Sequence, residues 1–159
     1  MATLVGQQGW AVTSIAQVIE RAGVSRKTFY EYFPDKLACF LEAYREVTEP
    51  LVARLSRAEG GGARRTRTQV LGYLEAISQD PVVARACIVE VLHAGPAALL
   101  ARDEVNRRFA DLVFGHRSKD PLVRRALIGG VNDVVTTELL AGRTDVRRLG
   151  PSLLAFARR

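Results

Sequence analysis

The stretch VTSIAQVIERAGVSRKTFYEYF, Val12 to Phe33, decides the fold of this chain. Its first half repeats apolar residues at the three- and four-residue spacing of an amphipathic helix: Ile15, Val18, Ile19 and Ala22. Ser14 and Gln17 match a capping box, which predicts that this helix begins near Ser14. Gly23 is expected to end it, because glycine readily adopts the left-handed conformation found at helix ends.

The second half of the stretch predicts another short helix, from Arg26 to about Tyr32, with Ser25 as its cap. Val24 is expected to fill the corner between the helices, with Phe29 and Phe33 on the buried side. Two helices joined by a short glycine-containing turn form a helix-turn-helix unit, whose second helix enters the major groove of DNA.

Polar groups occupy the exposed side of this second helix. Arg26 and Lys27 can reach guanine edges or phosphates. Thr28 can contact a thymine methyl or a phosphate, and Tyr30 offers a hydroxyl to a phosphate. The helical pattern alone also fits a small hairpin whose polar face is simply solvated.

The longer stretch GWAVTSIAQVIERAGVSRKTFYEYFPDK resembles the DNA-binding domain of the TetR family of bacterial transcriptional regulators. The resemblance covers Gly9 to Tyr44 and includes Gly9-Trp10, Thr13, Ala22 to Ser25, Thr28-Phe29-Tyr30, Tyr32-Phe33 and Lys36. It implies a dimeric repressor with an N-terminal three-helix DNA-binding domain and a helical C-terminal domain that dimerises and binds a small molecule. It also implies DNA contacts at the matching positions, which are Thr13, Arg26, Lys27, Thr28, Tyr30, Tyr32 and Lys36.

Two features depart from the family pattern. Ile19 stands where members usually have a small residue, often alanine, so the packing of the two helices has to accommodate a larger side chain. The first helix is expected to be truncated, because the chain begins at Met1, close to Gly9. Leu4 and Val5 can supply part of its apolar face.

The composition excludes several classes of protein. The 159 residues are 48% hydrophobic, which suffices for a packed core. No apolar run approaches the ~20 residues of a membrane helix, and residues 1–10 do not form a signal peptide. We therefore expect a cytoplasmic protein with no membrane partner. Cys39 and Cys87 have no metal-binding spacing, and buried reduced thiols are favoured over a redox switch.

The net charge of +6 is not itself an argument for DNA binding. Residues 1–48 contain as many acidic as basic side chains, so the positive excess lies downstream of the predicted DNA-binding part. The argument rests instead on where Arg26, Lys27 and Lys36 are placed.

The chain is predicted to be all-α, with a DNA-binding domain over residues 1–47 and a ligand-binding and dimerisation domain over residues 48–159. A long helix follows Asp35, and Pro50 is expected to kink or split it. Residues 59–63 form a glycine-rich linker. Further helices are expected around residues 70–77, over 82–92, 97–114 and 122–140, and from 144 onward, and no strand-like alternation is present.

Two further sites are predicted in the C-terminal part. One is a pocket for a small, largely apolar ligand. The residues expected to line it could equally be residues of the hydrophobic core: Tyr73, Cys87, Val91, Phe109 and Val113. A dimer interface is assigned the apolar face of the last helices: Leu122, Ala126, Gly130, Val134, Leu149 and Leu153. A helix buried within a monomer is the alternative explanation for the latter pattern.

An enzyme is the competing class of function. The two histidines, His93 and His116, are accompanied by no paired carboxylates, nucleophile elbow, phosphate-binding loop or metal cluster. The sequence therefore predicts no cofactor and no metal. It predicts a homodimeric regulator that binds a palindromic operator in double-stranded DNA and is released by an unidentified small-molecule effector. The alternative is a DNA-binding dimer that has no small-molecule inducer.

Overall fold

The computed structural model describes residues 1–115 and 118–157, and His116 lies outside them. Within these residues the secondary structure is helical, as the sequence predicts. The helices are α1 (Ala2–Gln8), α2 (Ile15–Ala22), α3 (Arg26–Tyr32), α4 (Lys36–Ser56), α5 (Gly62–Gln79), α6 (Pro81–Ile88), α7 (Pro96–Phe114), α8 (Pro121–Leu140) and α9 (Gly150–Phe156). Two 3₁₀ helices, η1 (Glu90–His93) and η2 (Val146–Leu149), precede α7 and α9.

Side-chain caps define where the predicted helices begin. The Ser14–Gln17 capping box is present at α2, and Gly23 ends that helix with φ 66°. The Ser25 hydroxyl accepts a hydrogen bond from the Thr28 amide at α3. Asp35 and Asp80 cap α4 and α6 in the same way. The capping predictions for this part of the chain are therefore confirmed.

Two helices differ from the prediction. Helix α4 is not split at Pro50 but continues through it, because the proline removes a single backbone donor while α5 and α7 pack along the helix. It also runs across residues 47 and 48, so the predicted domain boundary falls inside a continuous helix. The helix expected over residues 82–92 instead ends at Ile88 and continues as the tighter η1, in which Glu90 points inward and is buried.

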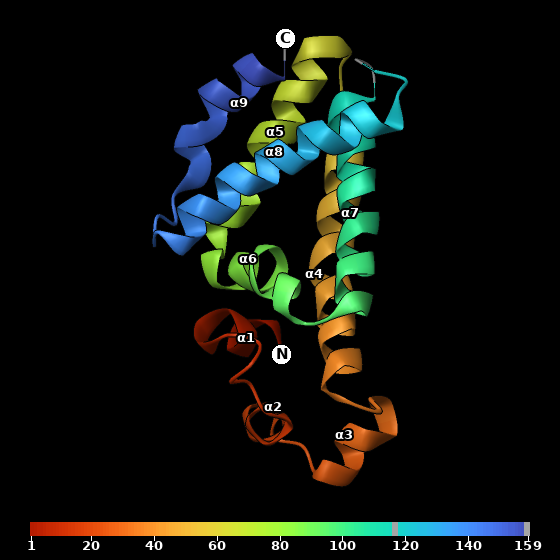
Figure 1. The fold of residues 1–159 in the computed structure, drawn as a ribbon, viewed down its shortest axis with the longest axis vertical. Coiled ribbons are helices and arrows are strands. Elements are labelled where there is room, and N and C mark those ends of the chain that lie inside the picture. Colours follow the sequence, from red (N-terminus) through yellow and green to blue (C-terminus); the bar gives the residue numbers. More distant parts are fainter. Residues whose placement is uncertain (116–117, 158–159) are drawn as a thin grey trace.

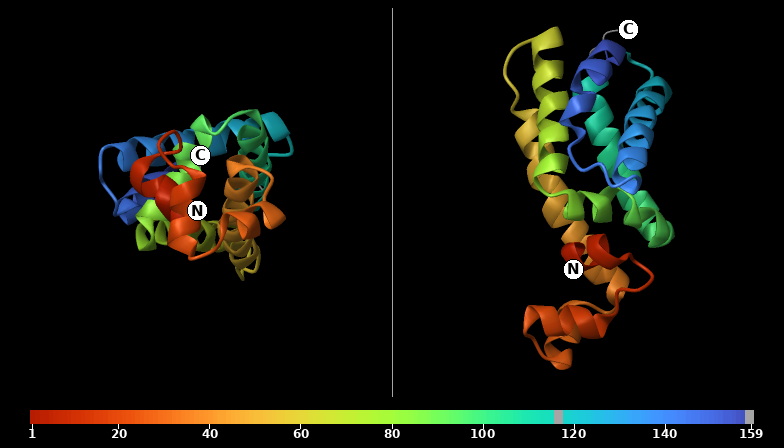
Figure 2. Two further views of the ribbon diagram at one scale, coloured as in Figure 1. Left: turned by 90° about the horizontal axis from the view of Figure 1, so that it is seen from below. Right: turned by 90° about the vertical axis from the view of Figure 1, so that its left-hand side faces the viewer.

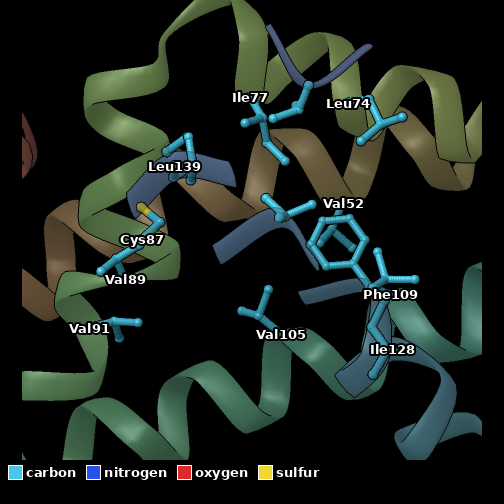
Figure 3. Close-up of a cluster of buried hydrophobic side chains, with 14 of the residues drawn as sticks. Val52, Leu74, Ile77, Cys87, Val89, Val91, Val105, Phe109, Ile128 and Leu139 are labelled. Atoms are coloured by element: carbon cyan, nitrogen blue, oxygen red, sulfur yellow. The ribbon is translucent and has the colours of Figure 1, made fainter. Parts of the chain in front are cut away.

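The molecule is elongated, with α2 and α3 at one end (Figure 1). Helix α4 leads from that end along α7, while α5 and α8 complete the bundle and α9 packs against α5 (Figures 1 and 2). The main core lies inside this bundle, where side chains from several helices converge (Figure 3). No helix in residues 1–115 and 118–157 is long and apolar enough to cross a membrane.

A second, smaller core holds the helix-turn-helix together. Val18, Phe29 and Cys39 are buried against one another, and Ile19 is partly buried beside them. The larger side chain at position 19 is therefore accommodated at the edge of this core. Val24 is 39% exposed, so the prediction that it fills the corner is wrong; Phe29 occupies the space between the helices instead.

Helix α1 packs mainly against α6, which belongs to the C-terminal bundle (Figure 1). The contact is close at Gly6, where an added Cβ would lie 1.9 Å from the carbonyl oxygen of Val82. A glycine is needed there because the two backbones leave no room for a side chain. The N-terminal helix thus joins the two parts of the molecule.

Candidate nucleic-acid interface and cavity

Helix α3 presents its polar side chains to solvent. Arg26 and Lys27 are exposed in the first turn, Tyr30 is 44% exposed and Tyr32 is 75% exposed. The Arg26 guanidinium lies over the Tyr30 ring, 5.8 Å from its centroid, which restricts both side chains. The half-buried Thr28 keeps its hydroxyl 2.9 Å from that of Ser25. Five of the seven predicted contact residues therefore lie together on one helix.

The other two predicted contact residues, the buried Thr13 and the half-buried Lys36, make hydrogen bonds within the protein. Thr13 is 1% exposed, and its hydroxyl donates a hydrogen bond to the Gly9 carbonyl. The Lys36 ammonium donates to the carbonyl oxygens of Trp10 and Thr13 at 3.0 and 2.9 Å, and lies 4.1 Å from the centroid of the Trp10 ring. The polar groups of both side chains bind the α1–α2 loop, so the predicted DNA contacts of Thr13 and Lys36 compete with contacts inside the protein and stay predictions.

The structural role of Lys36 leads to a prediction. We expect Lys36→Met, which keeps the aliphatic length but removes the charged donor, to lower the unfolding free energy by about 1–3 kcal/mol. Lys27→Met is the matched control, because Lys27 is exposed and should affect DNA affinity without affecting stability. Thermal unfolding of both variants tests this. An unchanged melting temperature for Lys36→Met, together with a salt dependence of DNA binding reduced by about one phosphate contact, would favour the original phosphate role.

Trp10 links the helix-turn-helix to the bundle. Its backbone amide donates to Glu90 Oε2 at 2.9 Å, and the same buried carboxylate accepts from Arg85 at 3.2 Å. Its ring packs on Phe40 with a centroid separation of 5.2 Å. Together with the Lys36 contact, these interactions fix the α1–α2 loop to η1 on one side and to α4 on the other.

A partly open cavity of about 380 Å³ lies within the bundle between α4, α5, α6, α7 and α8. Apolar side chains form most of its lining, including Val47, Leu51, Ile77, Val83, Val105 and Phe109. This volume falls at the lower end of the range of about 300–1,000 Å³ typical of small-molecule sites. Helix α6, which supplies part of this wall, also carries α1 on its outer side.

The cavity contains three of the five residues predicted to line a pocket. Tyr73, Cys87 and Phe109 line it. Val91 is fully buried in the core and does not line it, and Val113 lines a separate small space of about 20 Å³. These two positions are corrected, because Val113 lies further along the α7 stripe than Phe109 and Val91 lies in η1, beyond the end of α6. Burial raises the pKa of the Cys87 thiol to about 12, and both cysteines are free and buried.

Polar residues cross one wall of the cavity. The Tyr73 hydroxyl donates to Asn132 Oδ1 at 3.2 Å, and Asn132 Nδ2 donates to Asn106 Oδ1 at 3.0 Å. Arg102 also lines the cavity. Apart from Tyr73, these residues were not predicted from the sequence. Two of them have a sequence signal: Asn132 is a polar residue among the apolar side chains of α8, and Arg102 continues the inward stripe of Val105 and Phe109.

The outer face of α8 is apolar and exposed. Leu122 is 73% exposed and Val134 is 39% exposed, with Ala126 and Gly130 exposed between them. A Cβ added at Gly130 would meet no atom within 4 Å. Leu153, by contrast, is 8% exposed within its own chain, which corrects its place in the predicted interface. Leu149 is half-buried, and Phe156 is the large apolar residue that α9 exposes.

Comparison with known proteins agrees with this geometry. The family model described as "Bacterial regulatory proteins, tetR family" matches residues 2–43. The transcriptional regulator FadR from Bacillus subtilis, in complex with stearoyl-CoA, is similar in structure, with a TM-score of 0.84 and 16% identity over 98% of this chain and 92% of that chain. The fatty acid degradation regulator FadR from Bacillus halodurans has a TM-score of 0.83 and 17% identity over 98% of this chain and 93% of that chain. No match was found among curated proteins by sequence.

An N-terminal helix-turn-helix with an exposed polar recognition helix, joined to a helical bundle, defines a DNA-binding transcriptional regulator. The family match identifies residues 2–43 as a DNA-binding domain of the TetR type. The structural likeness, at these identities, establishes that the fold extends over the whole chain. No group of side chains suited to hold a metal ion occurs in the part of the chain that the structure describes.

Proposed function

We propose that this protein is a homodimeric repressor that binds a palindromic operator and is released from it by a ligand bound in the bundle cavity. The observation that carries the DNA-binding part is the capped helix α3, whose Arg26, Lys27, Tyr30 and Tyr32 extend into solvent on the matched domain. Its site of action is then the cytoplasm, where the DNA of a bacterium lies.

A dimer follows from the way such a motif reads DNA. Two recognition helices bind successive major-groove half-sites when they lie about 34–36 Å apart, one turn of the duplex. The exposed stripe of α8, from Leu122 to Val134, supports a two-fold contact with its copy, because its small residues allow two helices to approach closely. Phe156 on α9 extends the same proposed contact.

The effector part of the proposal rests on the cavity. The Bacillus subtilis FadR structure contains stearoyl-CoA, and that protein shares this fold. In this chain, α6 lines the cavity on one side and packs against α1 on the other, and Glu90 holds Trp10 just beyond it. A ligand that displaces α6 therefore moves α1 and the loop that positions the helix-turn-helix. In a dimer this changes the separation of the recognition helices, so that the operator no longer fits.

The alternative is a DNA-binding dimer without a small-molecule inducer. A thermal-shift screen separates the two, since a ligand that binds the folded state raises its apparent stability. We expect amphipathic compounds that enter the cavity to raise the melting temperature and to release bound DNA. A ligand that raises the melting temperature without releasing bound DNA would favour the alternative.

Substitutions on α3 test the proposed contacts. Arg26→Ala should weaken operator binding by about 1–3 kcal/mol and relax the preference at one base pair, whereas Tyr30→Phe should weaken binding to all sequences by about 0.5–1.5 kcal/mol. Arg57→Ala, an exposed arginine after α4, is the control for loss of charge. Fluorescence anisotropy on operator and scrambled duplexes measures both effects. An unchanged affinity for Tyr30→Phe would contradict its phosphate role.

A further inference from the structure

The half-buried arginines of the C-terminal bundle differ in whether a carboxylate neutralises the guanidinium. Arg85, Arg108 and Arg124 each lie against a carboxylate, at 3.2 Å from Glu90, 2.5 Å from Glu49 and 2.8 Å from Asp111, respectively. Arg102 is also half-buried, yet in residues 1–115 and 118–157 it has neither an ion pair nor a hydrogen bond from its side chain. A cation removed from water without a partner is costly, which makes this position unusual.

The guanidinium of Arg102 belongs to the cavity. Ala98, Val105, Phe109 and Val113 are buried along α7 at spacings of seven, four and four, and Arg102 divides the gap of seven into the four and three of a continuous stripe. It lines the cavity together with Tyr44 and Tyr73. Burial raises the pKa of both tyrosine hydroxyls, and the positive charge of Arg102 acts in the opposite direction on each, so the guanidinium lies near both.

A second donor lies beside Arg102. Asn106 follows it by four residues, so both side chains are on the same face of α7, and both line the cavity. Asn106 uses its Oδ1 to accept from Asn132, which leaves its Nδ2 group as a donor. The wall therefore presents a guanidinium and an amide N–H group side by side, which suits an oxygen anion.

The other charged residues of the lining do not neutralise this position. Asp80 also lines the cavity, but its carboxylate caps α6 by accepting from the Val83 amide at 3.0 Å. Arg54, which lines the cavity as well, donates to the Gly72 carbonyl at 3.2 Å. The charged groups around the cavity are thus two arginines and one engaged carboxylate, and the rest of the lining is mainly apolar.

We propose that the effector is an amphipathic anion, an acyl chain whose tail fills the apolar cavity and whose negatively charged end binds Arg102 and Asn106. This inference rests on the proposed function, because it names the chemistry of the ligand in the same cavity. The anionic group is either the carboxylate of a free fatty acid or a phosphate of an acyl ester such as an acyl-CoA. In both cases the ligand supplies the partner that Arg102 lacks.

Matched ligands test the charge without any substitution. Isothermal titration of the wild-type protein with decanoate, decan-1-ol and decanoyl-CoA compares one tail with three end groups. We expect decanoate or decanoyl-CoA to bind on the order of 10- to 100-fold more tightly than decan-1-ol, the range for a hydrogen bond to a charged group. The ligand that shows this advantage tells whether the cavity binds the carboxylate of a fatty acid or the phosphate of an acyl ester.

Arg102→Gln should remove that advantage while retaining binding of decan-1-ol. Arg107→Gln is the matched control on the same helix, because Arg107 is exposed and paired with Glu104. Equal affinity for all three ligands in the wild type, or an advantage that persists in Arg102→Gln, would overturn the inference but leave an effector cavity intact. If none of the three binds, the acyl ligand proposed here is excluded. A compound of another class that then raised the melting temperature and released DNA would leave the proposed function standing.

Discussion

Replacing Ala126 with arginine is expected to abolish specific DNA binding. Ala126 is exposed at the centre of the α8 stripe, beside Gly130, and the proposed two-fold contact places it against its own copy. Two arginines across a two-fold axis repel each other and fill the space that the small side chains leave. A monomer retains one recognition helix, so affinity for the operator should fall toward the non-specific level, a loss of at least about 1,000-fold.

The control for this substitution is Ala97→Arg. Ala97 is also an exposed helical alanine, but it lies in the first turn of α7, away from the stripe. Sedimentation and anisotropy should show a monomer with weak binding for Ala126→Arg and a DNA-binding dimer for Ala97→Arg. An Ala126→Arg protein that remained dimeric and bound its operator would place the interface elsewhere on the molecule.

Phe40→Ala is expected to have the largest effect on stability. Phe40 is fully buried at the start of α4, where it packs on Trp10 and Tyr44 with ring centroids 5.2 and 6.5 Å away. Removing a buried phenylalanine ring costs about 3–5 kcal/mol. That is a large part of the 5–15 kcal/mol that stabilises a typical domain. The loss also frees the Trp10 ring, which holds the α1–α2 loop.

Denaturant unfolding measures this effect, with Phe40→Leu and Tyr32→Ala as references. Phe40→Leu keeps most of the apolar volume and should cost well under half as much. Tyr32 is 75% exposed, so its truncation should change the unfolding free energy by no more than about 0.5 kcal/mol. A Phe40→Ala protein as stable as the Tyr32→Ala protein would contradict the packing of Phe40 against Trp10 and Tyr44.

The helix-turn-helix could be predicted from sequence because its signals are local. Ser14 with Gln17, Gly23 and Ser25 each act within one helical turn, and the structure contains all of these caps. The contacts of Lys36 with the carbonyls of Trp10 and Thr13 could not be predicted, because those partners are distant in sequence, and the burial of Thr13 depends on the same packing. A polar side chain beside a recognition helix has the same pattern whether it contacts a phosphate or a backbone carbonyl, and only packing separates the two.

The C-terminal sites were harder to predict for a related reason. Helical period separates the inner from the outer face, so the exposure of Leu122, Ala126 and Val134 could be anticipated. It does not say where along a buried stripe the packing leaves a cavity, which is why Val91 and Val113 were included. Leu153 was misplaced because α9 is short and its inner face packs on α5, which the sequence does not reveal.

The measurement that tests the central claim most directly is selection of bound duplexes from a random-sequence pool by the full chain. The selected and scrambled sequences are then compared by anisotropy at two salt concentrations. We predict enrichment of a two-fold symmetric sequence with half-site centres about 10 base pairs apart, bound as a dimer with an affinity that falls as salt rises. Recovery of no sequence, or equal binding to selected and scrambled DNA, would contradict a specific DNA-binding regulator.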